Sequence, residues 1–159
     1  MTKNQLHRCL RGFTFIELLI VIGILTAILA LTALARPALT VAGRMQRREA
    51  LIELGAGLNQ AIEEVQDAAD EARAAVIRSL ADRRINREQL AELVARFEAA
   101  DEQLAALLSR MEDLKPQLED ERDHQLLCDA IEATRNLSAA IHRLGVALKV
   151  LELLVIGQE

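Results

Sequence analysis

Glu17 is the residue whose type and position point most specifically to chemistry. It stands near the start of an otherwise uncharged stretch that runs from Phe13 to Ala35. A charge inside a membrane-length apolar segment is costly, so such a residue usually has a function and a partner. The simpler alternative is a carboxylate that reaches the lipid headgroups, since it lies only about 6 Å along a helix from the start of the stretch.

Other reactive residues do not form a complete site. His124 and Cys128 are four residues apart, so a helix would place two metal ligands on one turn, with Asp120 or Glu121 nearby. Two neighbouring ligands are far short of a closed metal site, and such a cysteine is more often a small half-buried side chain. As a lone thiol in an oxidising compartment, it could also form an intermolecular disulfide.

No set of residues indicates catalysis. His142 has no visible acid–base partner in the sequence, and Gly55-Ala56-Gly57 lacks the preceding strand and the following lysine of a phosphate loop. The acidic run at residues 119–123 favours the first turn of a helix and is most simply solvated. We therefore expect neither an enzyme nor a metal or other cofactor.

The stretch that holds Glu17 is long enough to cross a membrane. Residues 13–35 would form about 34 Å of helix, against about 30 Å of hydrocarbon. Lys3, Arg8 and Arg11 form a basic arm before it, and further arginines follow it, so the positive-inside rule alone does not decide its orientation. Residues 33–35, Ala-Leu-Ala, look like a signal-peptidase site, so ordinary signal cleavage remains an alternative.

The run GFTFIELLIV, from Gly12 to Val21, resembles the class III signal of type IV prepilins and of the pseudopilins of type II secretion. The resemblance covers about residues 11–29. It implies that a membrane prepilin peptidase cuts after Gly12 on the cytoplasmic side and N-methylates Phe13, and that Glu17 is the acid of the family's motif. It also implies a cytoplasmic leader, a single-pass helix in the bacterial inner membrane and a C-terminal region in the periplasm or outside the cell.

Cleavage after Gly12 would supply a partner for Glu17. The new α-amino group would lie about one helical turn from the carboxylate. Because both charges lose solvation, such a pair selects a register more reliably than it adds stability. In the family, the acid of one subunit is thought to meet the terminal amine of its neighbour during filament assembly. The expected partners are therefore the prepilin peptidase, other pilin-like subunits or a second copy, and the lipid bilayer.

Charge is divided unevenly along the 159 residues, whose net charge is −5. Residues 1–48 hold seven Lys and Arg against one acid, whereas residues 49–159 hold twelve against 23. The basic part includes a juxtamembrane segment at residues 36–50 that can approach anionic headgroups. The acidic distal part argues against a nucleic-acid partner, because phosphate binding needs clustered Lys and Arg.

The distal part of the sequence has the pattern of helices almost throughout. Three series of apolar residues recur at spacings of three and four, each opposite a polar face, so each must pack against another helix. Scarce aromatic residues and abundant alanine weigh against a sheet. The series are Leu51, Leu54, Leu58, Ile62, Val65, Ala69, Ala72 and Val76; Leu90, Leu93, Phe97, Ala100, Leu104, Leu107, Met111 and Leu114; and Leu127, Ala130, Thr134, Leu137, Ile141, Leu144, Leu148, Leu151 and Val155.

We therefore predict an all-α protein in which an N-terminal transmembrane helix precedes an antiparallel helical hairpin extended to a three-helix bundle. Asn86 with Gln89 resembles a capping box that starts the second distal helix, and Pro116 marks the next boundary. The first distal helix could instead continue the membrane helix as far as about Leu80, with a bend expected near Pro37.

The strand-free distal part departs from the family, whose familiar members place a β-sheet over the C-terminal half of a long N-terminal helix. Many pilins also close a disulfide, but only Cys128 remains once the leader that carries Cys9 is removed. Four segments are expected. They are a cleavable basic leader at 1–12, a transmembrane and assembly helix at 13–35, the juxtamembrane segment at 36–50 and an exported helical bundle at 51–159.

Two functions follow from these observations. The first is a pilin-like or pseudopilin-like structural subunit of a pilus or pseudopilus, with Gly12 and Phe13 as processing residues and Glu17 as the assembly residue. The alternative is a single-pass, membrane-anchored helical scaffold or sensor that binds a protein partner outside the cytoplasm. The unusually apolar stretch at residues 141–156 would bind that partner, although another helix, another subunit or the bilayer surface could cover it instead.

Overall fold

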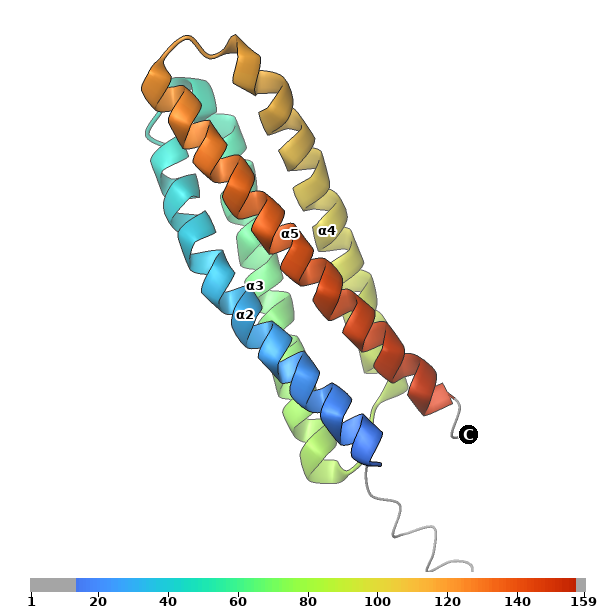
Figure 1. The fold of residues 1–159 in the computed structure, drawn as a ribbon. Coiled ribbons are helices and arrows are strands. Elements are labelled where there is room, and N and C mark those ends of the chain that lie inside the picture. The colour runs from blue at the N-terminus through green and yellow to red at the C-terminus, as the bar shows by residue number, and fades with distance from the viewer. Residues whose placement is uncertain (1–13, 157–159) are drawn as a thin grey trace, which may run out of the picture.

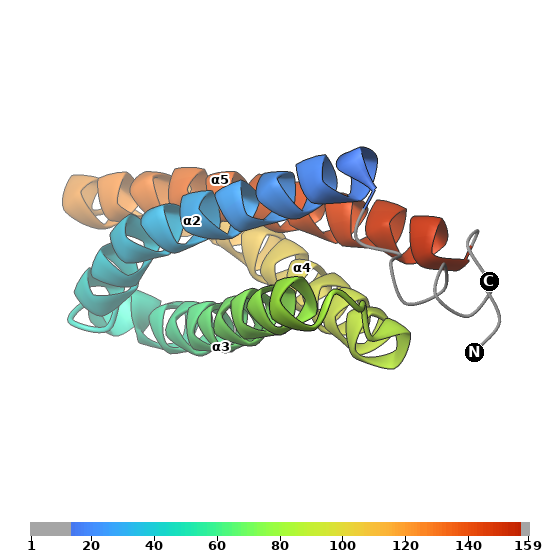
Figure 2. The same ribbon diagram turned by 90° about the horizontal axis from the view of Figure 1, so that it is seen from below.

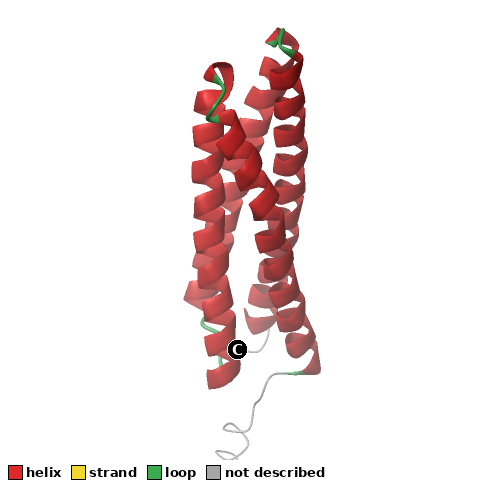
Figure 3. Cartoon of the chain, turned by 90° about the vertical axis from the view of Figure 1, so that its left-hand side faces the viewer, coloured by secondary structure: helices red, strands yellow, loops and turns green. Residues whose placement is uncertain are grey.

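The computed structural model describes residues 14–156, which form four long helices (Figure 1). They are α2 (Phe15–Met45), α3 (Ile52–Asp82), α4 (Arg87–Leu114) and α5 (Glu121–Ile156). Short 3-10 turns at Glu49–Leu51 and Lys115–Gln117 lie in two of the connections. The described residues contain no strand (Figure 3), so the prediction of an all-α protein is confirmed.

Successive helices run in opposite directions and lie side by side (Figures 1 and 2). α2 packs against α3 and α5, and α4 packs against the same two helices. The start of α2, the α3–α4 turn and the end of α5 therefore meet at one end of the molecule, which is termed the tip. The N-terminal helix, expected to stand apart in a membrane, thus lies alongside the three distal helices.

The three apolar series predicted for the distal helices form the core. Every member is buried except Leu114 and Val155, which are half-buried. Each series follows one face of its helix, and the opposite faces carry the charged residues. Ion pairs between side chains near the surface join neighbouring helices. They include Arg110–Glu53 at 2.9 Å between α4 and α3, and Lys149–Glu98 between α5 and α4.

α2 contributes a buried seam of its own to this core. Its buried residues follow one another in alternating steps of four and three, the heptad spacing of helices that pack almost parallel to one another. The members of this seam are Glu17, Val21, Ile24, Ile28, Leu31, Ala35, Ala38, Ala42 and Met45.

The helix boundaries confirm two predictions and correct a third. The Asn86 side chain accepts a hydrogen bond from the Gln89 N–H at 3.2 Å, and α4 begins at the next residue after Asn86. Pro116 lies in the 3-10 turn between α4 and α5, as expected. Pro37, however, lies inside α2, which continues to Met45. The suggested continuous helix to about Leu80 is therefore wrong, because the chain reverses over residues 46–51.

A close approach of two helices explains why the chain can reverse so tightly there. Gly55, in the first turn of α3, faces the end of α2. A Cβ atom at position 55 would lie 2.8 Å from the Met45 Cβ and 3.0 Å from the Ala42 carbonyl oxygen. Side chains do not tolerate such distances, so the absence of a Cβ permits the contact between α2 and α3.

Candidate assembly and membrane site

Thr14 and Glu17 close the start of α2 with a reciprocal cap. The Thr14 N–H donates to Glu17 Oε2 at 2.7 Å, and the Glu17 N–H donates to Thr14 Oγ1 at 3.2 Å. Thr14 has an extended backbone and is the N-cap, which makes Glu17 the third residue of the helix. The motif Thr-x-x-Glu is a capping-box signal in the sequence, and this role of Glu17 in folding is additional to the predicted roles in the membrane and in assembly.

Glu17 is also the first residue of the buried seam of α2. Its exposed fraction is only 6%, so the carboxylate lies at the edge of the core rather than extending into solvent. Burial of a carboxylate is tolerated where hydrogen bonds compensate for the lost hydration. The Thr14 N–H supplies one such bond.

The cap joins the carboxylate to Thr14, which is next in the sequence to the expected processing point. Gly12 and Phe13 lie outside the described residues, but Thr14 directly follows Phe13 in the sequence. The carboxylate accepts a hydrogen bond from the amide of the residue next to the expected new terminus. Because a carboxylate can accept several hydrogen bonds, this cap is compatible with a second donor such as an ammonium group.

The remaining surface of α2 is mainly apolar as far as Ala35, the residue before the exposed Arg36. Large side chains opposite the seam are exposed, with Phe15 at 74%, and they are not covered by any other helix. Among the described residues, α2 is the one helix that is long and apolar enough to cross a membrane. Only 28% of its most apolar stretch of 18 residues is buried. The exposed large residues of α2 are Phe15, Ile16, Leu18, Leu19, Ile22 and Leu29.

Packing in the bundle and crossing a membrane make conflicting demands on α2. The C-terminal half of α3 runs beside the N-terminal half of α2 and exposes charged residues such as Asp70 and Arg73. Charged side chains are costly in hydrocarbon. If α2 crosses a bilayer, its N-terminal half must therefore separate from α3.

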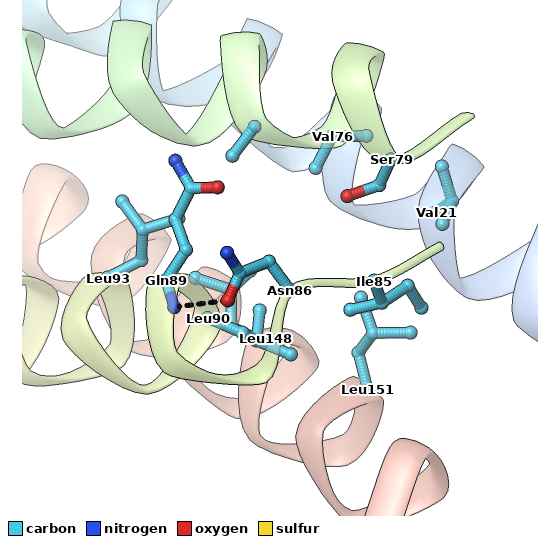
Figure 4. A pocket seen from close by; sticks show the side chains of 11 residues that line it. Val21, Val76, Ser79, Ile85, Asn86, Gln89, Leu90, Leu93, Leu148 and Leu151 are labelled. Atoms are coloured by element: carbon cyan, nitrogen blue, oxygen red, sulfur yellow. Dashed lines mark hydrogen bonds between the residues drawn. The ribbon is translucent and has the colours of Figure 1, made fainter. Parts of the chain in front are cut away.

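A small cavity lies where all four helices approach one another near the tip (Figure 4). Its volume is ≈ 20 Å³, room for about one water molecule. Val21 of α2 and Leu148 and Leu151 of α5 line it, together with residues of α3 and α4. The polar side chains of Ser79, Asn86 and Gln89 also line it, with the Asn86 cap at its edge (Figure 4).

The His124 and Cys128 pair does not develop into a metal site. The Cys128 thiol is free and half-buried, and its Sγ lies 3.8 Å from His124 Nδ1 on the same helical turn. In residues 14–156, no three His, Cys, Asp or Glu side chains gather as metal ligands would.

His142, which has no visible partner in the sequence, lies beside Asp101 in the structure. Ser138 Oγ donates to Asp101 Oδ1 at 2.6 Å, and His142 Nδ1 lies 3.8 Å from Asp101 Oδ2. The sequence separation hides this cluster, since Asp101 belongs to α4 and the other two residues to α5. The serine is bonded to the carboxylate rather than to the imidazole, so the cluster lacks the nucleophile–base contact of an activated serine.

The predicted juxtamembrane arginines lie at the end of the molecule opposite the tip. Arg44, Arg47 and Arg48 line an open hollow with Arg122 from the start of α5. Arg48 Nε lies 3.5 Å from Asp123 Oδ1, an oxygen that has no hydrogen bond among the described residues. This ion pair ties the end of α2 to the start of α5.

No protein-family model matches the chain, and no curated protein and no solved structure matches it significantly.

Proposed function

We propose that the chain is a pilin-like or pseudopilin-like structural subunit that prepilin peptidase processes between Gly12 and Phe13. The observation that carries this proposal is the position of Glu17. It is the one acid in α2 and lies four residues after Phe13, in a stretch with no other charge as far as Ala35. It stands at the helix start, and its carboxylate accepts a hydrogen bond from the Thr14 N–H. In an assembled filament, Glu17 pairs with the methylated terminal amine of a neighbouring subunit and sets the register between their α2 helices.

The proposed inserted form keeps α2 in the bacterial inner membrane and the rest of the chain in the periplasm or outside the cell. α2 first leaves the face of α3 and α5, because the charged side chains of α3 cannot follow it into hydrocarbon. The same apolar surface then contacts lipid before assembly and the α2 helices of other subunits afterwards. This function is structural and needs no catalytic residue or cofactor.

A pair of substitutions at position 17 separates capping from charge pairing. Glu17→Gln keeps an oxygen that can accept from the Thr14 N–H, but it removes the charge. Glu17→Ala removes both the acceptor oxygen and the charge. Wild-type and variant chains are expressed with the prepilin peptidase, surface filaments are sheared off, and the chain is quantified in the filament and membrane fractions.

The proposal predicts that both variants remain in the membrane and that neither enters filaments. Normal incorporation of Glu17→Gln would contradict the charge pairing and leave Glu17 as a helix cap. Detection of the wild-type chain only in the membrane fraction would contradict the proposal that the chain is a filament subunit.

An anchored scaffold or sensor is the alternative function. It is favoured by one observation, the exposed Val146, Val150 and Leu153 on α5, which are available to a protein partner outside the cytoplasm. For this function, Glu17→Ala leaves the membrane level and partner binding unchanged, whereas charge changes on α5 abolish binding.

A further inference from the structure

Large apolar side chains are exposed mainly at the tip. Of the twelve that are exposed among the described residues, ten lie on the first turns of α2, the end of α3 or the last turns of α5. The other two are Leu29, in the middle of α2, and Ile52, at the opposite end of the molecule. The ten are Phe15, Ile16, Leu18, Leu19, Ile22, Ile77, Val146, Val150, Leu153 and Ile156.

The parts of this surface on α2 and α5 lie beyond the two walls of one open groove. An open groove between the two helices is lined by Gly23 and Ala27 on α2 and by Ala139 and Arg143 on α5, among others. Leu19 precedes Gly23 by about one turn, and Val150 follows Arg143 by about two turns, so both continue the groove walls toward the tip. The exposed end of α5 therefore extends the apolar surface of the helix that is the membrane candidate.

The turn beside this apolar surface is basic. Residues 78–87, which end α3 and begin α4, contain four arginines and one acid. The other interhelix turn of the acidic distal part, residues 112–123, lies at the opposite end and contains six acids and two basic residues. An apolar end edged by arginines matches the acyl chains and anionic headgroups of a bilayer, whereas a uniformly apolar protein partner would leave the arginines unmatched.

We infer that the folded bundle docks on an anionic lipid surface through the tip, with the last turns of α5 entering the interface beside the first turns of α2. The arginines of the α3–α4 turn contact headgroups. The inference rests on the proposed membrane location of α2 and adds α5 as a second membrane-binding segment. Docking is shallow, about 5–10 Å deep, because charged residues of α3 and α4 begin directly behind the tip. In the docked bundle, α2 remains packed against α3 and α5.

The chain lacks tryptophan, so a single introduced tryptophan reports one position without background. Three full-length variants are compared: Leu19→Trp on α2, Leu153→Trp on α5 and Ile52→Trp at the opposite end. All three positions are exposed, so the larger side chain does not disturb the core. Each variant is mixed with phosphatidylcholine vesicles that contain phosphatidylglycerol and a lipid brominated near the headgroup or near the chain end. Emission wavelength and quenching are then measured.

The inference predicts blue-shifted emission for the probes at 19 and 153, with stronger quenching by bromine near the headgroup, and no change for the probe at 52. Quenching at 19 without quenching at 153 would overturn it and leave the membrane location of α2 intact. Absence of quenching at both would also remove the proposed membrane location. A blue shift in the emission of the tryptophan at position 153 that needs no lipid and grows with protein concentration would also overturn it. That result would mean that the tip binds a second copy of the chain.

The role of the basic turn is tested by neutralising two of its arginines. Arg78→Gln with Arg84→Gln is compared with Arg44→Gln plus Arg47→Gln, which changes the net charge equally at the opposite end. The first pair is expected to weaken partitioning into phosphatidylglycerol vesicles by about fivefold for each arginine, and the second pair by much less. Equal losses for both pairs would contradict docking through the tip.

Discussion

Thr14 and Glu17 each donate a backbone N–H to the other's side chain, which satisfies two of the donors left unpaired at the start of a helix. Glu17 therefore has a folding role in α2, independent of the proposed pairing with a neighbouring amine. The two roles need different properties of the carboxylate. Capping needs an acceptor oxygen, whereas pairing with an ammonium group in a poorly solvated setting needs the charge.

Removal of the Thr14 hydroxyl tests the cap. Thr14→Ala is expected to lower the free energy of unfolding by about 1 kcal/mol, because the Glu17 N–H loses its acceptor. Urea denaturation of the full chain, followed by circular dichroism, measures the change. Thr26→Ala is the matched control, since the Thr26 hydroxyl bonds to the Ile22 carbonyl of its own helix. A cost as large for Thr26→Ala as for Thr14→Ala would contradict the capping role.

At the scale of the elements, α2 is distinguished by having two apolar faces. One face is the buried seam, and the other is the exposed set that includes Phe15 and Leu29. α3, α4 and most of α5 have a single apolar stripe with a mainly charged opposite face, whereas the last turns of α5 expose several further large apolar side chains. This difference would allow residues 15–35 of α2 to exchange protein contacts for lipid contacts without burying a charge other than that of Glu17.

Glycine substitutions test the close contact that reverses the chain between α2 and α3. Gly55→Ala is expected to destabilise the fold by about 1–3 kcal/mol, because the new Cβ would overlap the end of α2. Gly43→Ala is the control, since a Cβ there meets no atom within 4 Å. It should stabilise α2 by up to about 1 kcal/mol through helix propensity. Denaturation midpoints that move in the same direction for both variants would refute this explanation.

The distal helices could be predicted from the sequence because their polar faces reveal which side is buried. The Asn86 cap and the Pro116 boundary were predictable from local chemistry. The packing of α2 was not, because a helix that is apolar all round does not show which face meets protein and which meets lipid. The reversal at residues 46–51 was not predicted, because the proline at position 37 is a stronger helix-breaking residue than any residue between 46 and 51. Within the site, the capping box Thr-x-x-Glu can be recognised from the sequence. The contact between Asp101 and His142 cannot, because the two residues lie on different helices that only the fold brings together.

For the whole molecule, the central proposal is that α2 has two alternative environments. In the bundle its seam packs against α3 and α5, and in the proposed inserted form the same residues face lipid or other subunits. Substitutions at positions outside α2 that weaken the bundle should therefore favour insertion, since they leave the sequence of the inserting helix unchanged and raise the free energy of the bundle.

Leu148→Ala applies this test from α5. Leu148 is fully buried and lines the cavity shared with Val21 of α2. Its truncation should destabilise the bundle by about 2–5 kcal/mol. In vesicles, a tryptophan at position 19 should then be quenched more strongly by bromine near the chain end, as α2 inserts more deeply. Ile52→Ala, a truncation at an exposed position at the end opposite the tip, serves as the control. Unchanged quenching depth in a destabilised Leu148→Ala chain would argue against two environments for α2.

The most direct test of the account as a whole is the intact mass of the chain after incubation with membranes that contain prepilin peptidase. The account predicts the loss of the twelve residues that end at Gly12, together with methylation of the new terminal Phe13. Retention of Met1, or cleavage after Ala35 in the manner of an ordinary signal peptide, would contradict it.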